Sequence, residues 1–189
     1  MSVAVPPKAM TTEEMLALPE NGVERWLVRG QLREKPMTIR NRTHSCIMAR
    51  VSYFLVNWLV QQPEPRGSVY CGEVGVRLRR GPDTTVGVDV AYASAETVAR
   101  QSDETTLIEG APVLAVEILS PNDTQEEINE KIDDYLVAGV TVVWIIDPHH
   151  RTVEIFQPGE EPVLVNIRQD LSGEPHLPGF HVAVAQLFA

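Results

Sequence analysis

Two acidic residues, Asp89 and Glu117, each stand alone in an otherwise apolar run of the chain. The runs, residues 85–92 and 113–119, are short, partly β-branched and typical of buried strands. An ionised carboxylate in such a strand costs on the order of several kcal/mol unless a cation, a metal or a proton compensates it. A divalent ion between the two acids would meet both costs, and hard carboxylate oxygens suit Mg²⁺ or Mn²⁺.

The segment after Glu117 predicts a turn and then a helix. Residues 120–123, Ser-Pro-Asn-Asp, close the strand, and Thr124 and Glu127 have the spacing of a capping box. Gly139 supplies a stop signal. Between these ends an apolar stripe repeats at helical spacing and consists of Ile128, Ile132, Tyr135 and Leu136.

Lys131 lies beside this stripe, at the edge of the expected core. From there its amine can reach toward the end of the preceding strand. An ion pair with Glu127 or Asp134 on the same helix is the simpler interpretation, and it contributes only about 0.2–0.5 kcal/mol. The sequence leaves both interpretations open.

The remaining chain predicts one α/β domain over residues 1–189, with residues 1–10 as a loose tail. A strand–helix–strand unit across residues 113–146 implies a locally parallel pair, so the sheet should be mixed and flanked by helices. Other expected elements are a helix at 11–18, a hairpin at 23–34 around Arg29-Gly30, a helix from about 41 to 61, strands at 69–78 and 85–92, a polar helix or loop at 94–110, a hairpin at 152–157 and 162–168, and an apolar terminal run that docks on the core.

The net charge of −10 argues against a protein that coats nucleic acid through bulk positive potential. The charge is uneven, since residues 1–80 carry 12 Lys/Arg and 7 Asp/Glu, whereas residues 81–189 carry 4 and 19. A basic face able to meet phosphates would contain Arg25, Arg29, Arg33, Lys35, Arg40, Arg42 and Arg50. The alternative is that these side chains are solvated or paired within the chain.

No apolar run approaches the roughly 20 residues that span a bilayer, and the start does not resemble a signal peptide. We therefore expect a cytoplasmic protein without a membrane partner. Cys46 and Cys71 lack metal-ligand spacing, and we expect buried free thiols. We expect the later histidines, His149, His150, His176 and His181, at the surface.

The order of a strand Asp at 89, V-E-I-L-S-P at 116–121, K-x-x-x-Y at 131–135, A-G-V at 138–140 and W-I-I-D-P at 144–148 resembles the Uma-two family. These are endonucleases with the restriction-endonuclease-like fold of the PD-(D/E)XK superfamily. The resemblance extends from the 23–34 hairpin to the C-terminal run, and implies a restriction-endonuclease-like core with added N-terminal and C-terminal hairpins.

The resemblance implies metal-dependent hydrolysis of phosphodiester bonds in DNA by a homodimer. Asp89, Glu117 and the Ile118 carbonyl would hold Mg²⁺ or Mn²⁺, and Lys131 would orient water or stabilise the transition state. Glu24 and Glu73 are candidates for a second metal, although strand glutamates are commonly structural. His44, in the first turn of the 41–61 helix, is an accessory candidate or a structural hydrogen-bonding residue.

Two positions depart from the superfamily pattern. Val88 replaces the proline that usually precedes the metal-binding Asp, and Leu119 replaces the lysine of E-x-K. Within the resemblance, the lysine has moved to the helix as Lys131. A rival interpretation is a catalytically inactive nuclease-fold module for oligomerisation or nucleic-acid binding. Retention of costly acids at Asp89 and Glu117 favours an intact site.

Overall fold

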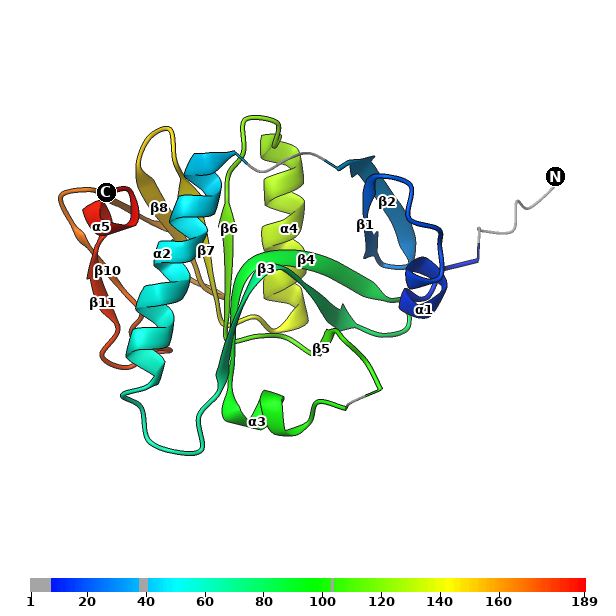
Figure 1. Cartoon of the computed structure of the whole chain (residues 1–189), viewed down its shortest axis with the longest axis horizontal. Coiled ribbons are helices and arrows are strands. Elements are labelled where there is room, and N and C mark those ends of the chain that lie inside the picture. Colours follow the sequence, from blue (N-terminus) through cyan, green and yellow to red (C-terminus); the bar gives the residue numbers. More distant parts are fainter. Residues whose placement is uncertain (1–7, 38–40, 103) are drawn as a thin grey trace.

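A computed structural model of the chain describes residues 8–37, 41–102 and 104–189. Its framework is a mixed sheet with the strand order β2-β1-β4-β6-β7-β8-β9, and β3 pairs with β4 and with β5 beside this path. The β6–β7 pair is parallel, whereas the other pairs along the path are antiparallel. The N-terminal hairpin and the C-terminal elements lie at opposite ends of the molecule (Figure 1).

The strands and helices occur in the following order: α1 (Thr12–Leu16), β1 (Val23–Val28), β2 (Gln31–Pro36), α2 (Arg42–Leu59), β3 (Ser68–Arg79), β4 (Thr84–Ala93), α3 (Ala95–Ala99), β5 (Ile108–Glu109), β6 (Leu114–Ile118), α4 (Gln125–Ala138), β7 (Val142–Asp147), β8 (Thr152–Phe156), β9 (Val163–Asn166), β10 (Asp170–Ser172), β11 (His181–Ala183) and α5 (Val184–Leu187). The strand–helix–strand unit β6–α4–β7 therefore forms as expected, with its two strands parallel. The 94–110 segment, for which the sequence predicts a polar helix or loop, contains the short helix α3 and also the short strand β5, which the sequence did not predict.

The central strands bury side chains on both faces. On β6, Val116 belongs to a core cluster with residues of α2, whereas the adjacent Ala115 belongs to a second cluster with residues of α4. Because successive strand residues point to opposite faces, α2 and α4 cover opposite sides of the sheet. Glu117 follows the alternation of Ala115 and faces α4.

Helix α4 begins and ends as its sequence predicts. Thr124 accepts a hydrogen bond from the Glu127 N–H, and the Glu127 side chain accepts from the Thr124 N–H, which completes the capping box. Gly139 adopts a left-handed conformation with φ of 97°, which glycine reaches without a steric penalty. The two caps fix where α4 begins and ends, and so determine which of its residues lie beside β6.

The β1–β2 hairpin is attached to the sheet near its tip. Arg29 and Gly30 have φ values of 51° and 76°, the positive pair that a two-residue hairpin turn requires. Leu27 of β1 lies opposite Thr85 of β4, and the Gly30 N–H donates to the Asp83 carbonyl at 2.6 Å. The rest of the hairpin stands away from β4.

The N-terminal segment packs against this hairpin. The Met10 N–H donates to the Gly30 carbonyl at 2.8 Å, and Asp83 accepts from both the N–H and the hydroxyl of Thr12. Residues 8–10 therefore contact the fold, and residues 1–7 of the expected tail lie outside the described residues.

The C-terminal run docks on the core, as expected. The buried side chains include Phe180, Val184 and Leu187, and the Trp58 indole N–H donates to the Pro178 carbonyl at 2.9 Å. The 152–168 hairpin forms as β8 and β9, an antiparallel pair.

The expectation of buried thiols is wrong, because Cys46 and Cys71 are both exposed. Cys46 precedes the buried Ile47 on α2 and points outward. Cys71 lies where the pairing of β3 with β4 shifts register, between Cys71 and Val74, and this irregularity turns it to solvent. The surface assignment of His149, His150 and His181 is confirmed, and His176 is partly exposed.

Candidate functional site

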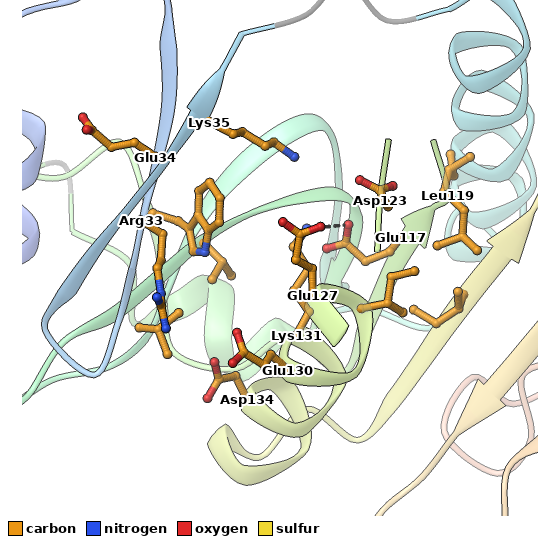
Figure 2. A pocket seen from close by; sticks show the side chains of 16 residues that line it. Arg33, Glu34, Lys35, Glu117, Leu119, Asp123, Glu127, Glu130, Lys131 and Asp134 are labelled. Atoms are coloured by element: carbon orange, nitrogen blue, oxygen red, sulfur yellow. Dashed lines mark hydrogen bonds and ion pairs between the residues drawn. The ribbon is translucent and has the colours of Figure 1, made fainter. Parts of the chain in front are cut away.

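Glu117 receives two side-chain hydrogen bonds from α4. The Lys131 amine donates to Glu117 Oε2 at 2.9 Å, and the Tyr135 hydroxyl donates to Glu117 Oε1. The dashed line in Figure 2 marks the lysine contact. Lys131 thus reaches the strand acid, and the simpler interpretation that paired it with Glu127 or Asp134 is wrong.

Helical periodicity explains why these two donors meet one carboxylate. Lys131 and Tyr135 are four residues apart, so their side chains lie above one another on the same face of α4. Tyr135 is buried, with 1% of its surface exposed, and this packing fixes the rotation of the helix. The lysine one turn earlier is thereby directed to Glu117, the penultimate residue of β6.

Asp89 lies next to Glu117 across the β4–β6 pair. Val90 and Val116 are the last pair before the β4–β6 ladder ends, and Asp89 and Glu117 are the next residues of the two strands. The Ile118 N–H donates to Asp89 Oδ2 at 2.8 Å rather than to a backbone carbonyl. Where the pairing of β4 with β6 ends, the Asp89 carboxylate therefore takes the position that a backbone carbonyl would have in a continued sheet.

His44 approaches Asp89 from α2. Its Nε2 lies 3.1 Å from Asp89 Oδ2, and both residues are buried. Asn41 caps α2 by accepting from the His44 N–H at 2.9 Å, which fixes the first turn that carries the imidazole. The accessory candidate His44 thus contacts the strand acid, and its role remains a prediction.

Burial dominates the electrostatics of the Glu117 cluster. Burial raises the pKa of Glu117, the Asp89 charge adds to the rise, and the Lys131 charge and the Tyr135 hydrogen bond oppose it. Burial lowers the pKa of Lys131, but the charge and hydrogen bond of Glu117 outweigh burial and raise that pKa overall. Burial and Glu117 raise the pKa of Tyr135 well above its ordinary value. At neutral pH, Lys131 is charged and Tyr135 keeps its proton.

A cavity of about 240 Å³ opens beside this cluster, between the β1–β2 hairpin and α4. Figure 2 shows Arg33, Glu34 and Lys35 on the hairpin side, and Lys131 on the helix side. The described lining residues include six acids and three bases. They are Glu34, Glu117, Asp123, Glu127, Glu130 and Asp134 among the acids, and Arg33, Lys35 and Lys131 among the bases.

The described residues contain no group of three or more His, Cys, Asp or Glu side chains arranged to hold a metal ion. Asp89 and Glu117 are two neighbouring carboxylates whose mutual repulsion contributes to the raised pKa of Glu117. This donor set fits Mg²⁺ or Mn²⁺ in one respect, because Mg²⁺ commonly uses one or two carboxylates and keeps several waters.

The accessory acids Glu24 and Glu73 do not line the cavity beside Glu117. Glu24 lies on β1 and is 3.3 Å from the Lys35 amine. Glu73 is exposed on β3 and has φ of 58° at the irregular step of the β3–β4 pair. Among the described residues, neither acid joins Asp89 and Glu117 in a group that could hold a metal ion.

The expected basic face is divided among different partners and surfaces. Arg25 pairs with Glu34, and Arg29 lies 3.7 Å from Asp134. Arg33 and Lys35 line the cavity, whereas Arg42 and Arg50 line a different hollow beside the start of α2. Arg40 lies outside the described residues.

Tyr135 was not among the site residues predicted from the sequence. Its position in the apolar stripe predicts a core residue, and it is indeed buried. The available signal was its spacing of four residues from Lys131, which places the hydroxyl over the same strand. A helix stripe that contains a tyrosine beside a strand acid indicates such a hydrogen bond.

Comparison with known proteins finds a similar structure and a matching family. A putative nuclease belonging to DUF820 from Anabaena variabilis has a crystal structure similar to this chain, with a TM-score of 0.75 and 23% identity over 95% of this chain and 97% of that chain. The fold prediction is confirmed: this is a restriction-endonuclease-like nuclease fold. A family model described as "Uma2: Putative restriction endonuclease" matches residues 12–185, and the chain belongs to this Uma2 (Uma-two) family. No curated protein matches the chain.

Among the described residues, no helix combines the length and apolar character needed to cross a membrane.

Proposed function

We propose that this chain is a metal-dependent DNA endonuclease that hydrolyses phosphodiester bonds. The observation that carries the proposal is the contact of the Lys131 amine with Glu117 at 2.9 Å, where the Asp89 charge is close enough to raise the pKa of Glu117. A charged amine and two carboxylates drawn from one helix and two strands are a costly arrangement where Asp89 is buried and Glu117 is partly buried. Clustered groups with perturbed pKa values beside a cavity are typical of functional sites.

Asp89, Glu117 and the Ile118 carbonyl are the proposed ligands of Mg²⁺ or Mn²⁺. The Ile118 N–H donates toward Asp89, and the carbonyl of a strand residue faces the same edge as its N–H. The chemistry that a bound divalent cation supplies is polarisation of the scissile phosphate and a lowered pKa for the attacking water.

Three side chains around the two carboxylates supply positive charge or hold the carboxylates in position. Lys131 keeps a positive charge at neutral pH and would stabilise negative charge that develops on the phosphate. Tyr135 fixes one oxygen of Glu117, and His44 contacts Asp89 from the other side of the sheet. We propose Tyr135 and His44 as positioning residues, because each acts through a carboxylate.

A homodimer, acting on DNA in the cytoplasm, completes the proposal. Its support is the family membership and the chemical requirement that one such site cuts one strand. Two copies would supply the second cut.

Nicking of supercoiled DNA with Mg²⁺ or Mn²⁺ tests the proposal. We expect the wild type to nick, and Glu117→Gln and Lys131→Ala each to lose about 100-fold or more of the rate, the scale on which removal of an electrostatic stabiliser acts. Asp133→Asn, an exposed acid on α4 that does not line the cavity, is the matched control. Equal rates in all four proteins would contradict the assigned site.

A catalytically inactive nuclease-fold module is the second candidate function. It is favoured by the acidic excess of the cavity lining and by the engagement of both Glu117 oxygens with α4. Titration calorimetry with Mn²⁺ separates the two. The endonuclease proposal expects binding that Asp89→Asn abolishes, whereas an inactive module expects no heat that depends on Asp89.

A further inference from the structure

The cavity beside Glu117 has an aromatic and apolar lining as well as a charged one. Trp26 of β1 is the only aromatic side chain among its described lining residues. The apolar residues around it come from four strands, from α4 and from the loop after β6, and are Val28, Val86, Ile118, Leu119, Ile128 and Ile145. A flat aromatic ring among aliphatic side chains suits a planar ligand group, since bases stack on such rings without regard to sequence.

One cation lies close to the Trp26 ring, and a second lies on the helix side of the cavity. The Lys35 amine lies 5.7 Å from the centroid of the Trp26 ring, and Figure 2 shows it extending from the hairpin toward Glu117 and Asp123. Its ion pair with Glu24 is partly exposed and contributes about 1 kcal/mol or less. Lys131 lies across the cavity, on α4. A phosphate between these two amines would adjoin a base on Trp26.

The acidic residues on the α4 side of the cavity disfavour binding of double-stranded DNA. Glu127, Glu130 and Asp134 line the helix side of the cavity, and Arg29 at the hairpin tip lies 3.7 Å from Asp134. These acids repel every phosphate that comes near them, and a duplex brings two phosphate strands, whereas one unpaired nucleotide brings a single phosphate. A base inside a duplex also cannot enter a cavity of about 240 Å³ without leaving its partner.

We infer that the cavity binds one unpaired nucleotide of single-stranded DNA, with its base stacked on Trp26 and its phosphate between Lys35 and Lys131. The inference rests on the proposed function, because it names the substrate of the same site. It makes Trp26 and Lys35 substrate-binding residues, and it makes an unpaired nucleotide, in a single strand or in a locally opened strand of a duplex, the group that enters the cavity of each copy.

Binding measured without a divalent metal tests this inference apart from cleavage. The probe is a fluorescein-labelled eight-nucleotide oligothymidylate in EDTA, followed by fluorescence anisotropy, with a GC-rich blunt duplex as the competing ligand. We expect Trp26→Ala to weaken oligothymidylate binding about 10-fold, within the range measured for loss of one base stack. Trp26→Phe should restore binding to within about 3-fold, because phenylalanine keeps a ring.

Tyr53→Ala is the matched control, because Tyr53 is an exposed aromatic residue on α2 that does not line the cavity. Its affinity should equal that of the wild type. Far-ultraviolet circular dichroism and the melting temperature of each variant establish that it is folded. If Trp26→Ala is misfolded, Lys35→Ala, which leaves the aromatic wall intact, should still weaken binding several-fold.

Intrinsic fluorescence supplies a second readout. Trp144 is fully buried, and Trp58 is 8% exposed and bonded through its indole N–H to Pro178. Unlabelled oligothymidylate should therefore quench mainly the emission of Trp26, and the quench should be lost in Trp26→Phe.

Equal affinity of the wild type and Trp26→Ala for oligothymidylate would overturn the inference, and so would a duplex that competes as well as the single strand. Nicking activity together with either result leaves the endonuclease proposal intact while the inference fails. Binding that depends on Trp26 in a protein that never cleaves leaves the inference standing while the catalytic proposal fails.

Discussion

At the scale of single residues, the site depends on how the partly buried carboxylate of Glu117 is hydrogen-bonded. Glu117 is the penultimate residue of β6, and both of its oxygens accept hydrogen bonds from α4. Removing either donor leaves part of a partly buried charge without compensation, which costs more than the net contribution of the hydrogen bond itself. Tyr135 and Glu117 should therefore be energetically coupled.

Tyr135→Phe should reduce the free energy of unfolding by about 1–3 kcal/mol, because the ring volume is kept and only the donor to Glu117 is lost. The same change in a Glu117→Gln background should cost less, since the buried charge is already gone. A double-mutant cycle by urea denaturation measures the difference, and we expect a coupling of about 0.5–3 kcal/mol. Equal costs in the two backgrounds would show that the hydroxyl does not serve Glu117.

At the scale of elements, α4 must end at a defined point for β7 to pair in parallel with β6. The left-handed Gly139 ends the helix, and the buried Val140 follows it immediately. At the other end of the sheet, Asp83 joins α1 to the turn between β3 and β4. We therefore expect substitutions at Gly139 and at Asp83 to change the stability of the fold.

Gly139→Ala should destabilise the fold by about 1–2 kcal/mol, since an L residue must adopt the left-handed region there. An added Cβ would meet only ordinary contacts, the nearest being Ala111 Cβ at 4.0 Å, so the cost should be conformational. Gly87→Ala is the control, because its added Cβ also meets only ordinary contacts, at 3.8 Å, and its φ is not positive. Thermal melting of both variants checks this, and comparable losses would contradict a conformational origin.

Stability at acid pH should depend on Asp83. Burial raises the pKa of Asp83, but hydrogen bonds from Thr12 and Gly81 and the charge of Arg77 outweigh burial and lower the pKa overall. A carboxyl group with a lowered folded-state pKa stabilises the fold above its unfolded-state pKa, and this contribution is lost as pH falls through the folded-state value. The contribution should therefore disappear only below about pH 3.9, the ordinary pKa of an aspartate.

Asp83→Asn should accordingly reduce the free energy of unfolding by about 1–3 kcal/mol at pH 7. The difference in unfolding free energy from the wild type should close as the pH falls below about 3.9. Denaturant unfolding at a series of pH values measures both quantities. Asp133→Asn, a substitution at an exposed position, should lie within about 0.5 kcal/mol of the wild type throughout. A gap that stays constant down to low pH would mean that the Asp83 charge is not responsible.

At the scale of the whole molecule, charge limits how DNA can approach. The chain carries a net charge of −10, and the bases among the described residues that line the cavity are Arg33, Lys35 and Lys131. Binding through so few phosphate contacts differs from binding through an extended basic surface, and salt dependence distinguishes the two.

The logarithm of the affinity for oligothymidylate should fall with the logarithm of salt concentration at a slope no steeper than about −2, the value for three cations on a single strand. Anisotropy titrations between low and moderate salt measure the slope, and Lys35→Ala should make it shallower by about 0.7. A slope steeper than about −4 would place further contacts outside the cavity, for example at Arg42 and Arg50.

The amino-acid order alone determined most of the elements and two of the proposed site residues. Helix α4, with its capping box at Thr124 and its stop at Gly139, follows from signals within a few residues of each end, and these act locally. Asp89 and Glu117 were identifiable because a lone acid in an apolar strand has a cost that the chain must offset.

The folded arrangement alone decided which side chains meet. Lys131 could have paired with Glu127 or Asp134, and its contact with Glu117 depends on the rotation of α4 that the burial of Tyr135 sets. The link from His44 to Asp89 spans 45 positions and requires α2 to pack over β4. The exposure of Cys71 follows from a register shift in β3. These outcomes depend on packing between segments distant in the chain, and local periodicity carries no information about it.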